Sequence, residues 1–145
     1  NTIRAVKQSV NIPVFANGDI DSAEKAEMVL VHTGCDGIMV GRGAHGRPWI
    51  FREINHFLRT QEHLPPPSSD EVRETVLGHL EDLYAFYGEF QGLRFARKHM
   101  GWYAAYLPDG AAMSRFFNKL ESSDQQLAFA RDYFGRLANG EVRAA

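Results

Sequence analysis

The chain has 145 residues, of which 44% are hydrophobic and 23% charged, and its net charge is −2. This composition is ordinary for a globular protein and gives no general argument for nucleic-acid or membrane binding. No apolar run approaches the roughly 20 residues of a membrane-spanning helix, and no signal-peptide pattern is present. A single cysteine, Cys35, excludes an internal disulfide, so we expect a reducing, cytoplasmic location.

Residues 1–62 alternate between helix and strand patterns. Apolar residues at helical spacing or in short runs, separated by Gly, Asn and Pro, predict five elements. They are a helix over 2–10, a strand over 14–16, a helix from Asp21 to Gly34, a strand over 38–40 and a helix over 49–58. Asp21 and Glu24 have the spacing of a capping box. The order is a βαβα portion of an α/β fold, and because Asn1 already lies in a predicted helix, we expect a piece of a longer protein.

The pattern changes at a proline-rich linker over residues 63–69, where three consecutive prolines form a stiff, extended connector. Beyond it the spacing predicts only helices, over 70–87, 91–107 and 111–120 and from Ser123 onward, broken at Gly88 and Pro108. Ser123 and Gln126 have the spacing of a helix start. We therefore expect an all-α, four-helix, bundle-like domain over 70–140 and a frayed tail over 141–145.

Each predicted strand ends in a polar loop that contains glycine: Asn17-Gly18-Asp19 follows the first strand and Gly41-Arg42 the second. Glycine lets backbone N–H groups approach an oxyanion closely, and arginine binds phosphate through paired N–H groups. The loops are about one βα repeat apart, like the phosphate-binding loops after the last two strands of a (β/α)8 barrel. We predict a phosphate site, in which Asp19 orients the loop or accepts a hydrogen bond from Arg42. The alternative is a pair of tight turns.

The helical half has a basic segment. Six acids and one base lie between residues 61 and 85, whereas five bases and two acids lie between 86 and 120. Arg94 and Lys98 share a helix face, and like charges at this spacing repel each other unless an anion lies near them. The segment therefore predicts either a contact with RNA phosphates or a solvated basic face.

Several other side chains have two open interpretations. Trp102, Tyr103 and Tyr106 either stack on a base or, as is commoner for aromatic residues at helical spacing, pack in a core. His45 either contacts a bound phosphate or only lines the mouth of its site. The histidines show no metal-ligand spacing, so we expect no metal site.

Four segments in order resemble the tRNA-dihydrouridine synthases, most closely the bacterial B type. They are Ile12–Ile20, Gly37–Ala44, Gly46–Phe51 and Leu93–His99, the last followed by Trp102-Tyr103. The resemblance covers nearly the whole chain. It implies a TIM (β/α)8 barrel that holds FMN, a helical domain that helps to hold tRNA, and reduction of uridine to 5,6-dihydrouridine in tRNA with NADPH. In such an enzyme the flavin passes hydride to the uracil ring and a cysteine supplies the proton.

The resemblance also assigns residues. The FMN-binding residues that it implies are Asn17, Gly18, Asp19, Gly41 and Arg42, and the tRNA-binding residues are Arg94, Arg97, Lys98 and His99. For His99, a structural role inside the helical domain is the equally good alternative. The family's catalytic cysteine lies in an Asn-x-Gly-Cys-Pro segment that this chain lacks, and Cys35 matches small residues in relatives. We therefore expect residues 1–62 to be the C-terminal portion of the barrel, no catalytic residue in this chain, and no activity of the chain alone.

Two other functions stay open. One is another FMN- or phosphate-binding TIM-barrel oxidoreductase, against which the basic helical half argues. The other is a non-catalytic helical module that binds RNA or protein. The flavin content of the full-length protein distinguishes these functions. Because two parallel strands without neighbours leave exposed edges, we also expect the first 60 residues alone to be poorly ordered, paired with another copy or stabilised by crystal contacts. Pairing with another copy would be self-association through the exposed barrel strands.

Overall fold

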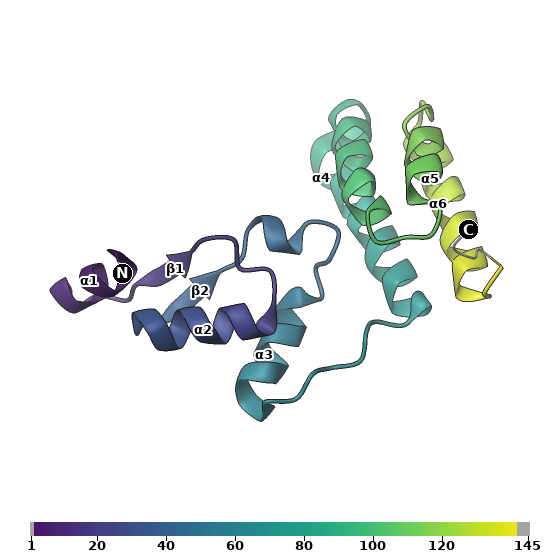
Figure 1. The fold of residues 1–145 in the computed structure, drawn as a ribbon. Helices are drawn as coiled ribbons and strands as arrows, with labels where there is room; N and C mark the ends of the chain where they lie inside the picture. The colour runs from purple at the N-terminus through teal and green to yellow at the C-terminus, as the bar shows by residue number, and fades with distance from the viewer. Residues whose placement is uncertain (1, 142–145) are drawn as a thin grey trace. The chain divides into compact units, whose positions relative to one another are not determined.

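A computed structural model describes residues 2–141, which form two compact units divided between Pro65 and Pro66, within the proline-rich segment. The first unit contains α1 (Thr2–Ser9), β1 (Phe15–Asn17), α2 (Ala23–Thr33), β2 (Gly37–Met39), the short 3-10 helix η1 (Arg42–Ala44) and α3 (Ile50–Thr60) (Figure 1). The second unit contains α4 (Ser69–Ala104), α5 (Gly110–Phe117) and α6 (Ser123–Ala138). The described residues are thus mostly helical, with a βαβα order in the first unit and helices alone in the second.

The strands β1 and β2 pair in parallel, with Ala16 opposite Ile38, and α2 contacts both strands. Ala16 is 1% exposed, whereas its neighbour Phe15 is 66% exposed, because successive side chains of a strand point to opposite faces. Each strand lies one residue from its predicted position, β1 later and β2 earlier in the chain. The sheet ends after Asn17 because Gly18 has a φ of 152°, which turns the chain away from the ladder.

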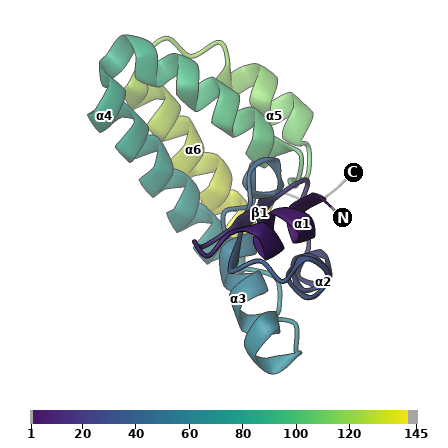
Figure 2. The same cartoon turned by 90° about the vertical axis from the view of Figure 1, so that its left-hand side faces the viewer.

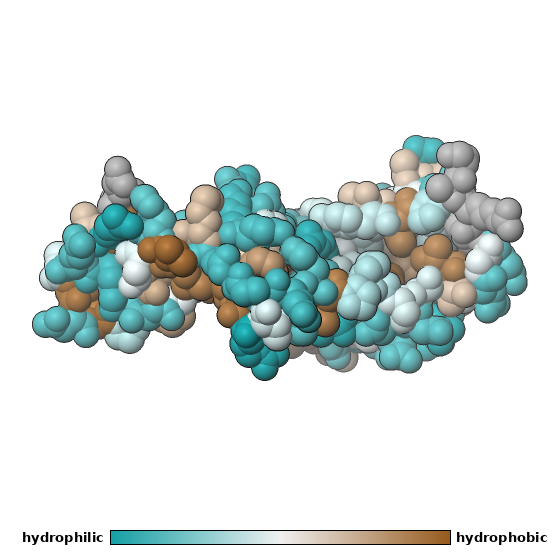
Figure 3. All heavy atoms as spheres, turned by 60° about the horizontal axis from the view of Figure 1, so that its bottom comes forward, coloured by the Kyte–Doolittle hydropathy of each residue, from teal (hydrophilic) through white to brown (hydrophobic). Residues whose placement is uncertain are grey.

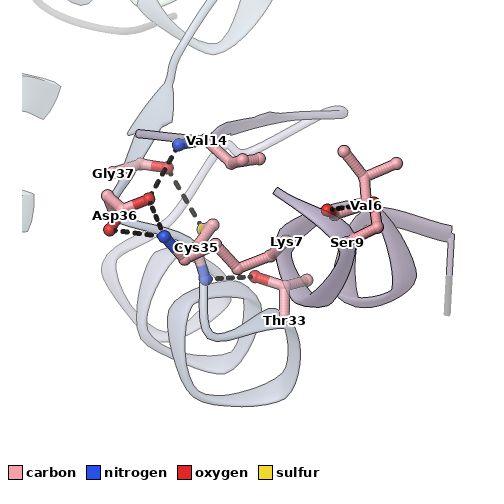
Figure 4. A network of polar contacts seen from close by, with 8 residues as sticks. All are labelled: Val6, Lys7, Ser9, Val14, Thr33, Cys35, Asp36 and Gly37. Carbon is pink, nitrogen blue, oxygen red and sulfur yellow. Dashed lines mark hydrogen bonds and ion pairs between the residues drawn. The ribbon is translucent and has the colours of Figure 1, made fainter. Parts of the chain in front are cut away.

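Asp36 fixes the start of the sheet (Figure 4). Its backbone N–H donates to Val14 O at 2.9 Å, and its carboxylate accepts from Val14 N at 2.7 Å and from Lys7 Nζ at 3.0 Å. The hydrogen bonds from Lys7 and Val14 lower the pKa of the Asp36 carboxyl group. Because Val14 is bonded to an aspartate side chain, the regular ladder begins one residue later than the apolar pattern predicted.

The core of the first unit lies between α2, α3 and the loop after β1. Its buried members are Ile20, Ala23, Ala26, Ile50, Ile54 and Phe57. Ile50, Ile54 and Phe57 recur at helical spacing along α3, so one side of this helix faces α2. Burial of a side chain of this size contributes about 1.5–3 kcal/mol, so these residues hold the helices against the sheet.

The predicted start of α6 at Ser123 is confirmed, but the residue that caps each helix lies one position from the one that the capping spacing suggested. Ser22, not Asp21, caps α2 and accepts from Lys25 N at 3.2 Å, while the Asp21 carboxylate lies 3.4 Å from Lys25 Nζ. Ser122, not Ser123, caps α6. Each serine has the extended backbone that aims its side chain at the first turn. The predicted end of α2 is confirmed, since Gly34 has a φ of 68°.

Helix α4 contains the two helices that were predicted separately. Ser68 and Glu71 form a capping box at its start, and Gly88, with φ 69° and ψ −179°, breaks the helical geometry inside it. Figure 2 shows the chain change direction within α4. We call residues 69–87 the first arm and residues 89–104 the second arm. The second arm stops at Ala104, before the predicted Leu107, where Gly110 packs directly against the Ala104 carbonyl.

The core of the second unit joins α4 to α5 and α6. Its fully buried side chains include Val76, Leu80, Met100, Phe117 and Phe134. Gln126, predicted to sit at a helix start, is also fully buried, and its Oε1 accepts from Tyr84 Oη at 2.7 Å. Helix α5 ends at Phe117, before the predicted Leu120. Of the predicted tail, residues 142–145 lie outside the described part of the chain.

The face that Figure 3 shows is mainly hydrophilic and carries several apolar patches. None of the helices in residues 2–141 combines the length and the apolar character needed to cross a bilayer. Within the same residues, no group of three or more His, Cys, Asp and Glu side chains is arranged to hold a metal ion.

Candidate functional site

The two glycine loops meet at the end of the sheet and line one cavity of about 320 Å³. Its lining residues are Asn17, Gly18, Asp19, Ile20, Gly41 and Arg42. The structure therefore brings together all five residues for which the sequence predicted a phosphate site. The cause is the topology, because the carboxyl ends of adjacent parallel strands meet at one edge of a sheet. His45, which follows η1, does not line this cavity.

Asp19 and Arg42 pair across the cavity. Arg42 Nη2 donates to Asp19 Oδ1, which confirms the predicted hydrogen bond between these side chains. Both side chains are largely exposed, at 67% for Asp19 and 78% for Arg42. Such an exposed pair contributes little to stability, at most about 1 kcal/mol, so the guanidinium remains available to an incoming anion. Asp19 has a positive φ of 44°, which places it in the tight turn after Gly18.

Gly43 does not line the cavity but allows its two loops to pack together, a role that the sequence did not predict. A Cβ atom at Gly43 would lie 2.3 Å from Ile20 O and 3.1 Å from Asp21 Cα. The loop after β2 therefore packs directly on the loop after β1, and only glycine allows this approach. Gly43 stands in the segment that carries the family resemblance, but its partner is 23 residues away, so spacing alone gave no signal.

A second cavity of about 460 Å³ adjoins the first and is mainly apolar. It is lined by Ile3, Asn17, Gly18, Met28, Val29, His32 and Thr33. It shares Asn17 and Gly18 with the phosphate-site candidate. The polar cavity can therefore take an anionic group while the adjoining one offers an apolar wall.

Cys35 lines neither cavity. Its side chain is 8% exposed, and its Sγ donates to Gly37 O at 3.2 Å, so the thiol is held inside the fold (Figure 4). A buried thiol bonded to backbone is a poor proton donor to a ligand at the sheet edge.

The four residues with a predicted RNA contact do not share one environment. Arg94 and Lys98 are exposed on the second arm of α4; the Arg94 guanidinium lies 5.9 Å from the centre of the Phe90 ring, and Lys98 Nζ lies 4.9 Å from that of Trp102. Arg97 is turned inward, where its Nη2 donates to Leu120 O at 2.9 Å. The Arg97 side chain therefore joins α4 to the segment between α5 and α6.

His99 and Tyr103 belong to an aromatic contact between the two arms of α4. The His79 ring lies 4.5 Å from the His99 ring, and the Tyr103 hydroxyl lies 3.1 Å from His79 Nδ1. Burial raises the pKa of Tyr103 to about 12 and lowers the pKa of His79. Tyr103 is 4% exposed, which confirms the core interpretation for it, whereas Tyr106 is 57% exposed.

Comparison with known proteins identifies the family. Residues 1–139 match the family model described as dihydrouridine synthase (Dus), so this chain belongs to the dihydrouridine synthase family. The chain is 57% identical over 139 residues to the tRNA-dihydrouridine synthase B of Xanthomonas axonopodis pv. citri and 54% identical over 144 residues to that of Pseudomonas aeruginosa. These matches cover 96% and 99% of this chain but only 42% and 43% of the two relatives.

Proposed function

We propose that this chain is part of an FMN-dependent tRNA-dihydrouridine synthase, which reduces uridine to 5,6-dihydrouridine in tRNA with NADPH as reductant. Residues 1–62 are the C-terminal portion of its TIM barrel, and residues 70–140 are its tRNA-binding domain. The observation that carries the proposal is the shared cavity of Asn17, Gly18, Asp19, Gly41 and Arg42, in a chain of which residues 1–139 match the family.

The residues at this cavity fit the phosphate group of FMN. A Cβ atom at Gly18 or Gly41 would meet nothing within 4 Å, so the backbone at both positions is open to a ligand. Arg42 supplies a permanent positive charge with a forked set of N–H donors. Asp19 holds that guanidinium at the cavity, and a phosphate would take its place as the partner of Arg42.

The role of this chain in the reaction is binding. FMN, when bound, supplies the hydride chemistry that amino-acid side chains lack. Arg42 and the glycine loops would hold its phosphate at the sheet edge, and the helical unit would hold the tRNA. Cys35 is buried and does not line the cavity, which agrees with a proton donor outside this chain.

The test uses the whole protein that contains this chain, produced in a strain that lacks dihydrouridine synthases. We expect yellow protein with bound FMN and restored dihydrouridine, measured by mass spectrometry of digested tRNA. Arg42→Gln removes a charged hydrogen-bond donor worth about 1.5–3 kcal/mol, so FMN affinity should fall about tenfold or more. Arg59→Gln, an exposed arginine of α3 outside the cavity, is the matched control.

Each alternative function predicts a different outcome. Colourless protein that takes up no FMN would contradict the flavoenzyme and favour a helical binding module. Bound FMN without any change in tRNA dihydrouridine would favour another FMN-dependent oxidoreductase. If Arg42→Gln and Arg59→Gln bound FMN with equal affinity, the result would contradict the phosphate site but not the flavoenzyme.

A further inference from the structure

We infer that the second arm of α4 binds a single-stranded segment of RNA along a stripe of four side chains, Phe90, Arg94, Lys98 and Trp102. We call these residues the ring–cation stripe. The inference rests on the proposed function, because it names the kind of RNA segment that the helical unit would hold. It adds two aromatic residues to the predicted contact and removes Arg97 from it.

The stripe follows from helical spacing. Its members are four residues apart, so each step advances about 6 Å along the arm and only about 40° around it. An aromatic ring stands at each end and the two cations stand between them. The contacts Arg94–Phe90 and Lys98–Trp102 join each cation to the ring at its own end of the stripe.

Three of the four stripe residues are open to a ligand, whereas Trp102 is half-buried, with its ring centre 4.7 Å from that of His99. Phe90 is 71% exposed, although burial of such a ring would be favourable, and Arg94 and Lys98 are exposed as well. Within residues 2–141, neither cation makes an ion pair, whereas other exposed bases do, as Arg131 does with Glu81. Two cations one turn apart with no carboxylate to neutralise them leave a positive potential that an anion would satisfy.

The chemistry of the stripe fits single-stranded RNA. Lys and Arg bind backbone phosphates, and exposed aromatic rings stack on bases that have left their own stack. A duplex offers the phosphates but keeps its bases stacked, so it would use only the middle of the stripe. The target uridine of a synthase must leave its stack to be reduced, so its neighbours in the RNA are unpaired nucleotides of this kind.

Arg97 does not belong to the ring–cation stripe. It is one residue from Lys98, but a helix turns about 100° per residue, which carries its side chain toward the segment between α5 and α6. There it donates to Leu120 O, and within the described residues its buried Nε has no partner. Arg97 therefore supports the packing of the unit, and the charge that faces RNA comes from Arg94 and Lys98.

The test measures binding of a fluorescein-labelled oligouridine to the 145-residue chain by anisotropy, over a series of KCl concentrations. Base stacking is worth about 1–3 kcal/mol per base, so Phe90→Leu and Trp102→Leu should each raise Kd about fivefold or more. Arg94→Gln and Lys98→Gln should each lower the salt slope of log K by about 0.7.

Matched controls lie on α5 and just after it. Phe116→Leu changes another exposed ring, 54% exposed, and Lys119→Gln another exposed lysine; both should leave Kd and the salt slope unchanged. Circular dichroism checks that every variant keeps its helix content. Because Phe90 is far more exposed than Trp102, its variant remains informative if Trp102→Leu unfolds the unit.

Three results would overturn the inference: no effect of the four variants, duplex RNA bound as tightly as oligouridine, or equal competition by poly-glutamate, which would mean that the stripe recognises charge alone. Absence of any RNA binding by the chain would also overturn it. The proposed function is judged separately, by FMN and tRNA dihydrouridine in the whole protein, so either can fail without the other.

Discussion

Substitution of Gly43 by alanine should force apart the two loops of the phosphate-site candidate. The new Cβ would lie 2.3 Å from Ile20 O, whereas real Cβ contacts below 3.0 Å are essentially never found. The obstacle is backbone, and the Ile20 side chain is 2% exposed in the core, so neither loop can yield without disturbing the packing of α2 and α3. Forced overpacking of this kind costs about 1–3 kcal/mol.

Hydrogen-exchange mass spectrometry can measure this cost in each unit separately. We expect peptides from α2 and α3 to lose about 1–3 kcal/mol of opening free energy in Gly43→Ala, with α6 unchanged. Gly78→Ala is the matched control, because Gly78 is exposed in α4 and its Cβ would enter open space. That change should stabilise the second unit by about 0.5–1 kcal/mol. Wild-type protection of α2 in Gly43→Ala would refute the reasoning.

Two predictions concern the helical unit. Phe134 is fully buried, so Phe134→Ala should lower the opening free energy of α6, measured by hydrogen exchange, by about 3–5 kcal/mol. Phe86 is 80% exposed, so Phe86→Ala should change that free energy by less than about 0.5 kcal/mol. Similar effects of the two variants would contradict the burial argument. Burial raises the pKa of Tyr103 to about 12, so stability should fall as pH rises from about 10 to about 12, because the unfolded chain loses the proton first. An absorbance titration of Tyr103→Phe should lack one late-ionising tyrosine, and an unchanged curve would contradict the assignment.

Much of the candidate site could be predicted because it depends on local patterns. An apolar run that ends in glycine and polar residues marks the end of a buried strand, and two such runs one repeat apart place both loops at one edge. The contact between Asp19 and Arg42 followed from the charges of those loops and is confirmed. The break at Gly88 was visible because glycine closed a helical pattern.

The remaining features depend on partners that are distant in the chain. The close approach of Gly43 to Ile20 and the bond from Arg97 to Leu120 join segments that no spacing rule connects. The cap residues differ from the predicted ones by one position because two adjacent residues, such as Asp21 and Ser22, are both suitable caps. Only the backbone geometry at each position decides between them.

The break at Gly88 determines how far the second arm of α4 is rotated about its own axis relative to the first arm. Its backbone angles lie in a region that is essentially limited to glycine, and the buried residues Val76 and Met100 stand on either side of it. One inserted or deleted residue would turn the second arm by about 100° about its own axis relative to the first. That rotation would carry Met100 out of the core and move the ring–cation stripe with it. The packing of the second unit therefore depends on the number of residues between the two arms as much as on the glycine itself.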